Sequence, residues 1–166
     1  MIYLGLEFKT DEEVVREYGE MVYKLAYSKT GTRHDSDDIF QEVFIRYVKK
    51  QAEFRDENHR KAWLIRVTIN CSNNFFNKAL RRKSVELKEV EGEMYQQEDK
   101  QELDLYKELQ KIPKKYREVI HLYYYEELTT EEISVVLKRR SSTIRTQLTR
   151  ARKLLKEFIK EEDYYD

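Results

Sequence analysis

The sequence predicts an all-α protein: two small helical domains joined by a flexible acidic linker, the second of them a helix-turn-helix. The first supporting observation is a shortage of turn residues, because the 166 residues include only 4 glycines and 1 proline. Hairpins and meanders need such residues at special dihedral angles, so a many-stranded sandwich or barrel is disfavoured. The second is a charged fraction of 39% combined with 13% aromatic residues, which is too aromatic for a disordered chain.

Several classes of protein are disfavoured by what the sequence lacks. It has no run of about 18 apolar residues, and its start lacks the basic flank and apolar stretch of a signal peptide, so we expect a cytoplasmic protein. The single cysteine, Cys71, permits no internal disulfide, and the three histidines lack metal-ligand spacing. Without a Ser/His/Asp or Cys/His grouping or a glycine-rich phosphate loop, we expect no enzyme, no metal and no cofactor.

Basic residues are concentrated in two blocks that contain no acidic residue, although the formal net charge is zero. Residues 59–83 hold seven basic residues and residues 138–156 hold eight, whereas residues 84–112 hold four basic and nine acidic ones. A uniformly solvated helical surface mixes both signs of charge. The blocks therefore predict two contacts with a polyanion, and chance clustering in a highly charged chain is the alternative.

The polar, acidic segment at residues 84–103 predicts a linker between a first domain at residues 1–83 and a second at residues 104–166. No internal repeat is visible.

The first domain is expected to contain three helices. Thr10 or Asp11 is available to cap the first, which ends near Gly31, and Asp35 to cap the second. The apolar spacing predicts the helices over residues 11–27, 36–50 and 61–83, with a polar loop at residues 51–59.

The second predicted helix has one apolar side and one polar side. Ile45 lies among the polar residues, opposite the broad apolar side. It is either an idle exposed side chain or the anchor of a protein contact, and periodicity alone does not decide between them. The polar side consists of Asp38, Gln41, Glu42, Ile45 and Lys49.

The second domain matches the plan of a helix-turn-helix. Pro113 suits the first turn of a helix that runs to about residue 127, and Thr129 or Thr130 with Glu132 predicts a capping box for a short helix. After a turn at residues 138–140, Ser141 or Ser142 is expected to cap a final basic helix through Ile159.

The start of that final helix carries side chains suited to base edges. Short hydroxyls, arginine and glutamine can hydrogen-bond in the major groove, where arginine favours guanine and glutamine favours adenine. A plain solvated face is the alternative. The residues concerned are Ser141, Ser142, Thr143, Arg145, Thr146 and Gln147.

Three ordered motifs resemble the extracytoplasmic-function (ECF) sigma factors, which are specificity subunits of bacterial RNA polymerase. DSDDIFQEVFIRYVKK at residues 35–50 is similar to the family's polymerase-binding helix, and AWLIRVTIN at residues 62–70 to its promoter-melting domain. IPKKYREVIHLYYYEELTTEEISVVL followed by STIRTQLTRARKLL is similar to the family's second domain. The resemblance spans nearly the whole chain.

The resemblance implies a role for each group of residues. Asp38, Gln41, Glu42 and Ile45 would contact the coiled coil of the polymerase β′ subunit. Capture of the non-template strand at the minus-10 element would fall to Phe54, Asn58, Arg60, Arg66, Asn70, Arg81 and Arg82. Duplex readout at the minus-35 element would fall to Arg139, Arg140, Ser141, Ser142, Thr143, Arg145, Thr146, Gln147 and Arg150.

The resemblance also implies partners. These are core RNA polymerase, contacted at its β′ coiled coil and its β flap, promoter DNA, and an anti-sigma factor, which in this family includes membrane-anchored ones. The turn before the last helix departs from the family, which usually has Gly, an apolar residue and Ser where this chain has Lys138, Arg139 and Arg140. A lysine held at positive φ costs about 1 kcal/mol, so an altered turn and base register are expected here.

Two other functions remain open at this point. A stand-alone helix-turn-helix repressor would explain residues 113–159 equally well, but not the basic block at 59–83 or the polar setting of Ile45. A helical adaptor or anti-sigma protein would use its basic faces to bind acidic partners.

Overall fold

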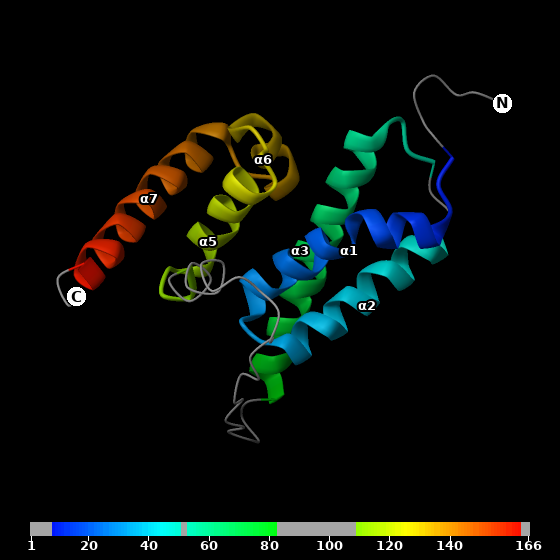
Figure 1. Ribbon diagram of the computed structural model, residues 1–166, viewed down its shortest axis with the longest axis horizontal. Coiled ribbons are helices and arrows are strands. Elements are labelled where there is room, and N and C mark those ends of the chain that lie inside the picture. Colours follow the sequence, from blue (N-terminus) through cyan, green and yellow to red (C-terminus); the bar gives the residue numbers. More distant parts are fainter. Residues whose placement is uncertain (1–7, 51–52, 83–108, 164–166) are drawn as a thin grey trace. The chain divides into compact units, whose positions relative to one another are not determined.

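The computed structural model describes residues 8–50, 53–82 and 109–163, with the backbone alone for residues 79–82 and 159–163. The chain divides into two compact units, Met1–Glu93 and Met94–Asp166. All regular structure within the described ranges is helical (Figure 1). The prediction of two small helical domains is confirmed, whereas the predicted linker and both of its boundaries lie outside the described residues.

Helix α1 spans Asp11–Thr30, and both of its ends follow from local sequence. The Thr10 hydroxyl accepts the Glu13 N–H while the Glu13 carboxylate accepts the Thr10 N–H, which completes a capping box. Gly31 ends the helix at a φ of 74°, a left-handed conformation that glycine adopts without steric cost. The predicted Thr10 cap and Gly31 end are confirmed.

Helix α2 spans Arg33–Lys50 and begins before the predicted start. The Asp35 N–H donates to the Thr32 hydroxyl at 3.2 Å, so Thr32 does the capping that was predicted for Asp35. Asp35 lies inside the first turn, where its carboxylate still complements the positive end of the helix dipole.

Helix α3 spans Glu57–Arg82 and begins four residues before the predicted Lys61. The Asp56 carboxylate accepts the His59 N–H at 2.7 Å, which is the geometry of an N-cap. The predicted polar loop is therefore shorter, and Asn58 lies in the first turn of α3 rather than in the loop.

The three helices of the first unit enclose one apolar core. Val14 and Val22 of α1, Val43 of α2 and Leu64 of α3 are fully buried in it. Trp63 packs against this core with partial exposure. The sides of α2 and α3 that face away from this core are available to contact other molecules.

The second unit begins with α5, Lys114–Ile120, which starts directly after Pro113. The predicted continuous helix to residue 127 is interrupted, because η1 at His121–Tyr125 is a π-helix in which the Glu126 N–H donates to the His121 carbonyl at 3.3 Å. Such wider turns redirect a helix without ending it.

The helix-turn-helix consists of α6, Thr130–Leu137, and α7, Ser141–Asp163. The Thr129 hydroxyl accepts the Glu132 N–H at 3.1 Å, which confirms the predicted cap. Lys138 takes a φ of 53° and ends α6 in the left-handed conformation, so the altered turn expected at this lysine is not observed. Ser141 and Ser142 lie within α7 rather than at its cap, which corrects the prediction.

Candidate nucleic-acid interface

One side of α7 is buried and the opposite side is exposed. Ile144, Leu148 and Ala151 lie in the core of the second unit. Because a helix turns 100° per residue, burial of this stripe leaves the other flanks of the first three turns outward. The predicted minus-35 residues that are exposed there are Arg140, Ser142, Thr143, Arg145, Thr146 and Arg150.

The outward side chains near the start of α7 can donate hydrogen bonds, and they comprise long arginines and short serine and threonine hydroxyls. Arg145 donates to the Ser141 hydroxyl at 2.8 Å, which folds its guanidinium back toward the helix N-terminus. The Thr146 hydroxyl donates to the Ser142 carbonyl at 3.0 Å. No acidic residue lies among residues 138–156, so this surface can approach an anionic duplex without charge repulsion.

Arg139 does not belong to this outward group. It forms an ion pair with Glu118 of α5, and its Nη1 donates to Gln147 Oε1 at 3.1 Å. The prediction grouped Arg139 and Gln147 with the outward DNA-facing residues. The structure instead ties them to each other and to α5.

Arg152 also has partners within its own unit. Its Nε donates to the Tyr124 hydroxyl at 2.7 Å, and its guanidinium lies 5.1 Å from the ring centroid of Tyr123. The hydrogen bond to Tyr124 raises the pKa of Arg152. These contacts connect α7 to η1, so Arg152 has a structural role besides any contact with phosphate.

The first unit presents the predicted protein-contact face on α2. Asp38, Gln41 and Glu42 are exposed, and Ile45 is 48% exposed. Val48 is equally exposed because it lies at the edge of the buried stripe of α2. Ile45 is therefore not a core residue, and an idle side chain or a contact anchor remain its two interpretations.

A groove of about 420 Å³ runs between α2 and α3 beside this face. Asp38, Glu42 and Arg46 line it from α2, and Glu42 pairs with Arg46 at 2.9 Å. Cys71 lies at its base, where burial raises the pKa of the thiol, so the sulfur is not a reactive thiolate.

Two of the predicted minus-10 residues are buried rather than displayed. Phe54 is 8% exposed and Arg60 is 5% exposed. The Phe54 ring stacks on Tyr47 with centroids 6.0 Å apart, meets Trp63 at 5.9 Å and lies under the Arg60 guanidinium at 5.4 Å. The sequence assigned Phe54 to the minus-10 contact from a polar loop, and the structure buries its ring because aromatic packing outweighs the polar character of that loop.

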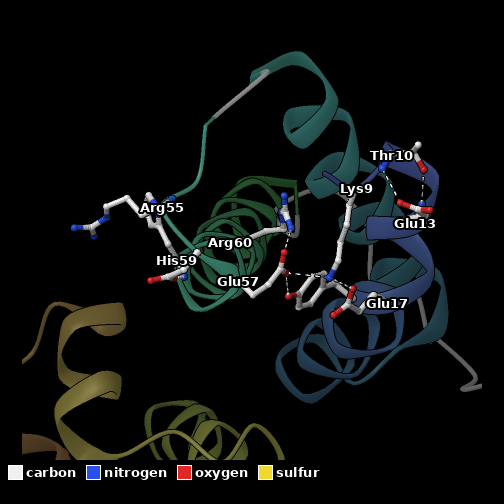
Figure 2. A network of polar contacts seen from close by, with 10 residues as sticks. Lys9, Thr10, Glu13, Glu17, Arg55, Glu57, His59 and Arg60 are labelled. Atoms are coloured by element: carbon white, nitrogen blue, oxygen red, sulfur yellow. Dashed lines mark hydrogen bonds and ion pairs between the residues drawn. The ribbon is translucent and has the colours of Figure 1, made fainter. Parts of the chain in front are cut away.

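A polar network holds the start of α3 against α1 (Figure 2). Glu57 pairs with Arg60, accepts the Tyr18 hydroxyl at 2.6 Å and lies 3.2 Å from Lys9 Nζ. Desolvation would raise the pKa of Glu57, but the bonds from Tyr18, Arg60 and Lys9 outweigh it and lower that pKa. Burial and the bond to Glu57 raise the pKa of Tyr18.

The remaining predicted minus-10 residues differ in position. Asn58 and Asn70 are exposed and Arg66 is half-buried, whereas the side chains of Arg81 and Arg82 lie outside the described residues. The sequence interpretation missed Arg55, which is exposed and points away from the network in Figure 2. The signal in the sequence was its position next to Phe54, which had been assigned to the minus-10 contact.

Among the described residues, no helix has the length and apolar content needed to cross a membrane, and no cluster of side chains suits a metal ion.

Comparison with known proteins identifies the family to which this chain belongs. Models of two families match, "Sigma-70 region 2" over residues 14–82 and "Sigma-70, region 4" over residues 102–155. The ECF RNA polymerase sigma factor SigW of Bacillus subtilis is 30% identical over 169 residues, covering 90% of this chain and 88% of that protein. The chain belongs to the ECF RNA polymerase sigma factors.

Further matches agree with this assignment. SigE of Mycolicibacterium smegmatis is 27% identical over 160 residues, and the match covers 89% of this sigma factor and 61% of that longer protein. The solved structure of the sigma factor RpoE from Bartonella quintana shares the fold, with a TM-score of 0.77 at 22% identity, covering 90% of this chain and 96% of that one.

Family membership assigns the two units. Sigma-70 regions 2 and 4 read the minus-10 and minus-35 promoter elements, and the factors that contain them are transcription initiation factors rather than enzymes. Helices α1, α2 and α3 belong to region 2, and α5, α6 and α7 to region 4. The ECF prediction is confirmed, and the repressor and adaptor interpretations are set aside.

The Glu57 network generates a pH prediction. The lowered pKa of Glu57 stabilises the folded unit above the unfolded value of about 4.3, and this stability is lost as pH falls through the lowered value. Glu57→Gln should therefore reduce the free energy of unfolding by about 1 kcal/mol at pH 7, and by less under acid conditions.

The measurement is denaturant unfolding followed by the fluorescence of Trp63, the only tryptophan and a neighbour of Phe54 in this unit. Glu12→Gln is the matched control, because Glu12 pairs with Arg16 on the exposed surface of α1. Equal stability changes in both variants, or a Glu57→Gln difference that does not shrink in acid, would contradict the role of the network.

Proposed function

We propose that α7 is the recognition helix for the minus-35 duplex and that its outward side chains enter the major groove. The observation that carries this proposal is the exposed face of α7 over residues 141–156, which contains no acid and on which short hydroxyls and arginines surround the helix start. Arg145 and Thr146 are placed for base edges. Arg140, Thr143 and Arg150 flank them and suit either bases or phosphates.

We further propose that the exposed side of α2 binds the β′ coiled coil of core polymerase. Ile45 supplies an apolar centre, and Asp38, Gln41 and Glu42 supply a polar rim, which is the usual anatomy of a protein interface. By the same resemblance the second unit would meet the β flap. A factor that works on the polymerase acts in the cytoplasm, where we place this chain.

At the minus-10 element we assign strand contacts to five of the predicted residues. Asn58, Arg66 and Asn70, with Arg81 and Arg82 at the end of α3, would hold the non-template strand. Phe54 and Arg60 would not contact the strand themselves. Their mutual packing would hold in place the first turn of α3, which carries Asn58. Arg55 extends this surface.

The proposed action is a shift in an equilibrium rather than a covalent step. Duplex contacts by α7 position the holoenzyme, and the first unit binds a base that has left the stack. Unstacking costs a few kcal/mol, whereas stacking on a protein platform returns about 1 to 3 kcal/mol per base. Because the two quantities are comparable, opening needs the additional contacts of the polymerase.

Run-off transcription tests this function. With core polymerase and a library of genomic promoter fragments, the wild-type factor should direct specific transcripts, and Ile45→Glu should reduce them about tenfold or more by placing a charge in the β′ contact. Gln41→Ala should weaken polymerase binding to a smaller extent. The variants are compared in pull-downs with β′ and in thermal melts.

Glu12→Ala on the exposed side of α1 serves as the control and should leave transcription unchanged. A large fall in the melting temperature of Ile45→Glu would mean that Ile45 supports the fold, against its position on α2. Nanomolar sequence-specific binding by the free factor in gel shifts would favour a repressor.

Two arginines of α7 should respond differently to truncation. Arg145→Ala should lose about 1 to 3 kcal/mol on the best promoter and relax preference at one or two minus-35 positions, because Arg145 faces outward near the helix start. Arg152→Ala should mainly lower the free energy of unfolding of the second unit, by about 0.5 to 1 kcal/mol, because it removes the contacts of Arg152 with Tyr123 and Tyr124.

Both variants are measured as holoenzymes on matched and mismatched minus-35 sequences over a range of salt, together with thermal melts of the free factor. An equal loss on every sequence for Arg145→Ala would contradict base reading. Unchanged stability for Arg152→Ala would show that its contacts with the tyrosines contribute little.

We also propose an anti-sigma factor as a partner. The solved RpoE structure is a complex with the anti-sigma factor NepR, and CnrH, which has a TM-score of 0.66 and 21% identity, is in complex with the cytosolic domain of CnrY. Purification of this factor from native cells should recover an inhibitor that suppresses run-off transcription. If the factor is recovered only with polymerase, or alone, its activity is regulated through its own synthesis rather than by an inhibitor.

A further inference from the structure

Arg139 connects the turn between α6 and α7 with α5 and with α7 itself. It lies in the turn between α6, which ends at Leu137, and α7, which begins at Ser141. Its guanidinium pairs with Glu118 of α5, which is 3% exposed, and donates to Gln147 on the second turn of α7. The resulting chain runs Glu118–Arg139–Gln147.

This chain determines which way the Gln147 amide points. A guanidinium has only N–H donors, so the Gln147 atom that faces Arg139 at 3.1 Å must be the carbonyl oxygen Oε1. The Nε2 amino group then lies on the other side of the amide plane. Gln147 is therefore left with two N–H donors and with an oxygen that is already engaged.

Guanine and adenine present different edges to such a donor. Guanine offers two acceptors in the major groove, N7 and O6, whereas adenine offers the acceptor N7 beside the N6 donor. The usual bidentate pairing of glutamine with adenine needs both amide atoms. A glutamine whose oxygen is held by Arg139 matches guanine instead.

We propose that Arg139 is a positioning residue that holds Gln147 as a donor-only reader of guanine in the minus-35 element. The inference rests on the proposed function, in which α7 occupies the major groove. It revises two expectations drawn from the sequence, that Arg139 contacts DNA itself and that glutamine here favours adenine. Gln147 is half-exposed on the flank of α7 that carries Thr143.

The burial of the ion pair explains why Arg139 stays in place. The side chain of Glu118 is 4% exposed and that of Arg139 is 29% exposed, so both groups have given up most of their contact with water. Moving Arg139 to a phosphate would leave a buried carboxylate without this cation, which is costly. The neighbouring Arg140 is fully available at the surface.

The test is selection of duplexes by reconstituted holoenzyme from a promoter library randomised across the minus-35 element. Gln147→Ala identifies the position that Gln147 contacts, as the one where base preference is lost. At that position the wild-type factor should select guanine. Arg139→Met, which frees the Gln147 oxygen, should raise the ratio of adenine to guanine among the selected duplexes about tenfold.

Salt dependence provides a second readout with a matched control. Arg139→Met should leave the salt slope of binding unchanged, because Arg139 makes no phosphate contact. Arg140→Met should reduce the slope by about one without changing base preference. A purely structural role for Arg139 would instead weaken binding to all sequences equally and leave the guanine-to-adenine ratio unchanged, whatever Arg139→Met does to the melting temperature by leaving Glu118 without this cation.

Gln147→Glu keeps an acceptor toward Arg139 and removes the donors, at a surface position that should not affect folding. It should lose guanine preference about tenfold even if Arg139→Met folds poorly. Unchanged guanine preference in Gln147→Glu, or an unchanged guanine-to-adenine ratio in a folded Arg139→Met, would overturn the inference.

The outcome for Arg145→Ala separates this inference from the proposed function. If Arg145→Ala alters minus-35 preference while Arg139→Met does not, only the positioning role fails. If no α7 variant alters preference, α7 is not the recognition helix, and both proposals fail.

Discussion

Burial of the apolar stripe of α7 determines which side chains this sigma factor can present to promoter DNA. Ile144, Leu148 and Ala151 are removed from water against the rest of the second unit, and their burial sets the rotation of the helix about its axis. Once that rotation is set, Arg145 and Thr146 must face outward. The same constraint acts on α2, where burial of Ile39 and Val43 leaves Ile45 exposed.

Charge in this protein is organised at two levels. Along the chain, basic residues form acid-free blocks, which give region 4 an unopposed positive surface. In space, individual arginines of those blocks pair with acids that lie outside the blocks, since Arg60 pairs with Glu57 one turn earlier on α3 and Arg139 pairs with Glu118 of α5. The first level favours association with a polyanion in general. The second removes particular arginines from that role and uses them to hold neighbouring residues in place.

The amount of the site that could be predicted varies with the range of the interactions involved. The Thr10 and Thr129 caps were predictable, because each depends on a few adjacent residues, whereas the left-handed Lys138 runs against the altered turn that the sequence led us to expect. The Asp35 cap was wrong because Thr32 is a competing residue three positions earlier. The burial of Phe54 was not predictable, because its environment comes from Tyr47 and Trp63 on two different helices.

By itself, the sequence determined the helical class, the division into two domains, the helix-turn-helix and the exposed setting of Ile45. These follow from composition, from the 3.6-residue period and from order along the chain. Only the tertiary structure decided which basic side chains remain available to DNA. That decision depends on contacts such as Arg152 with Tyr124 and Arg139 with Glu118, whose partners lie 28 and 21 residues away. No local pattern encodes such a pair, because it forms only when packed helices bring the two side chains together.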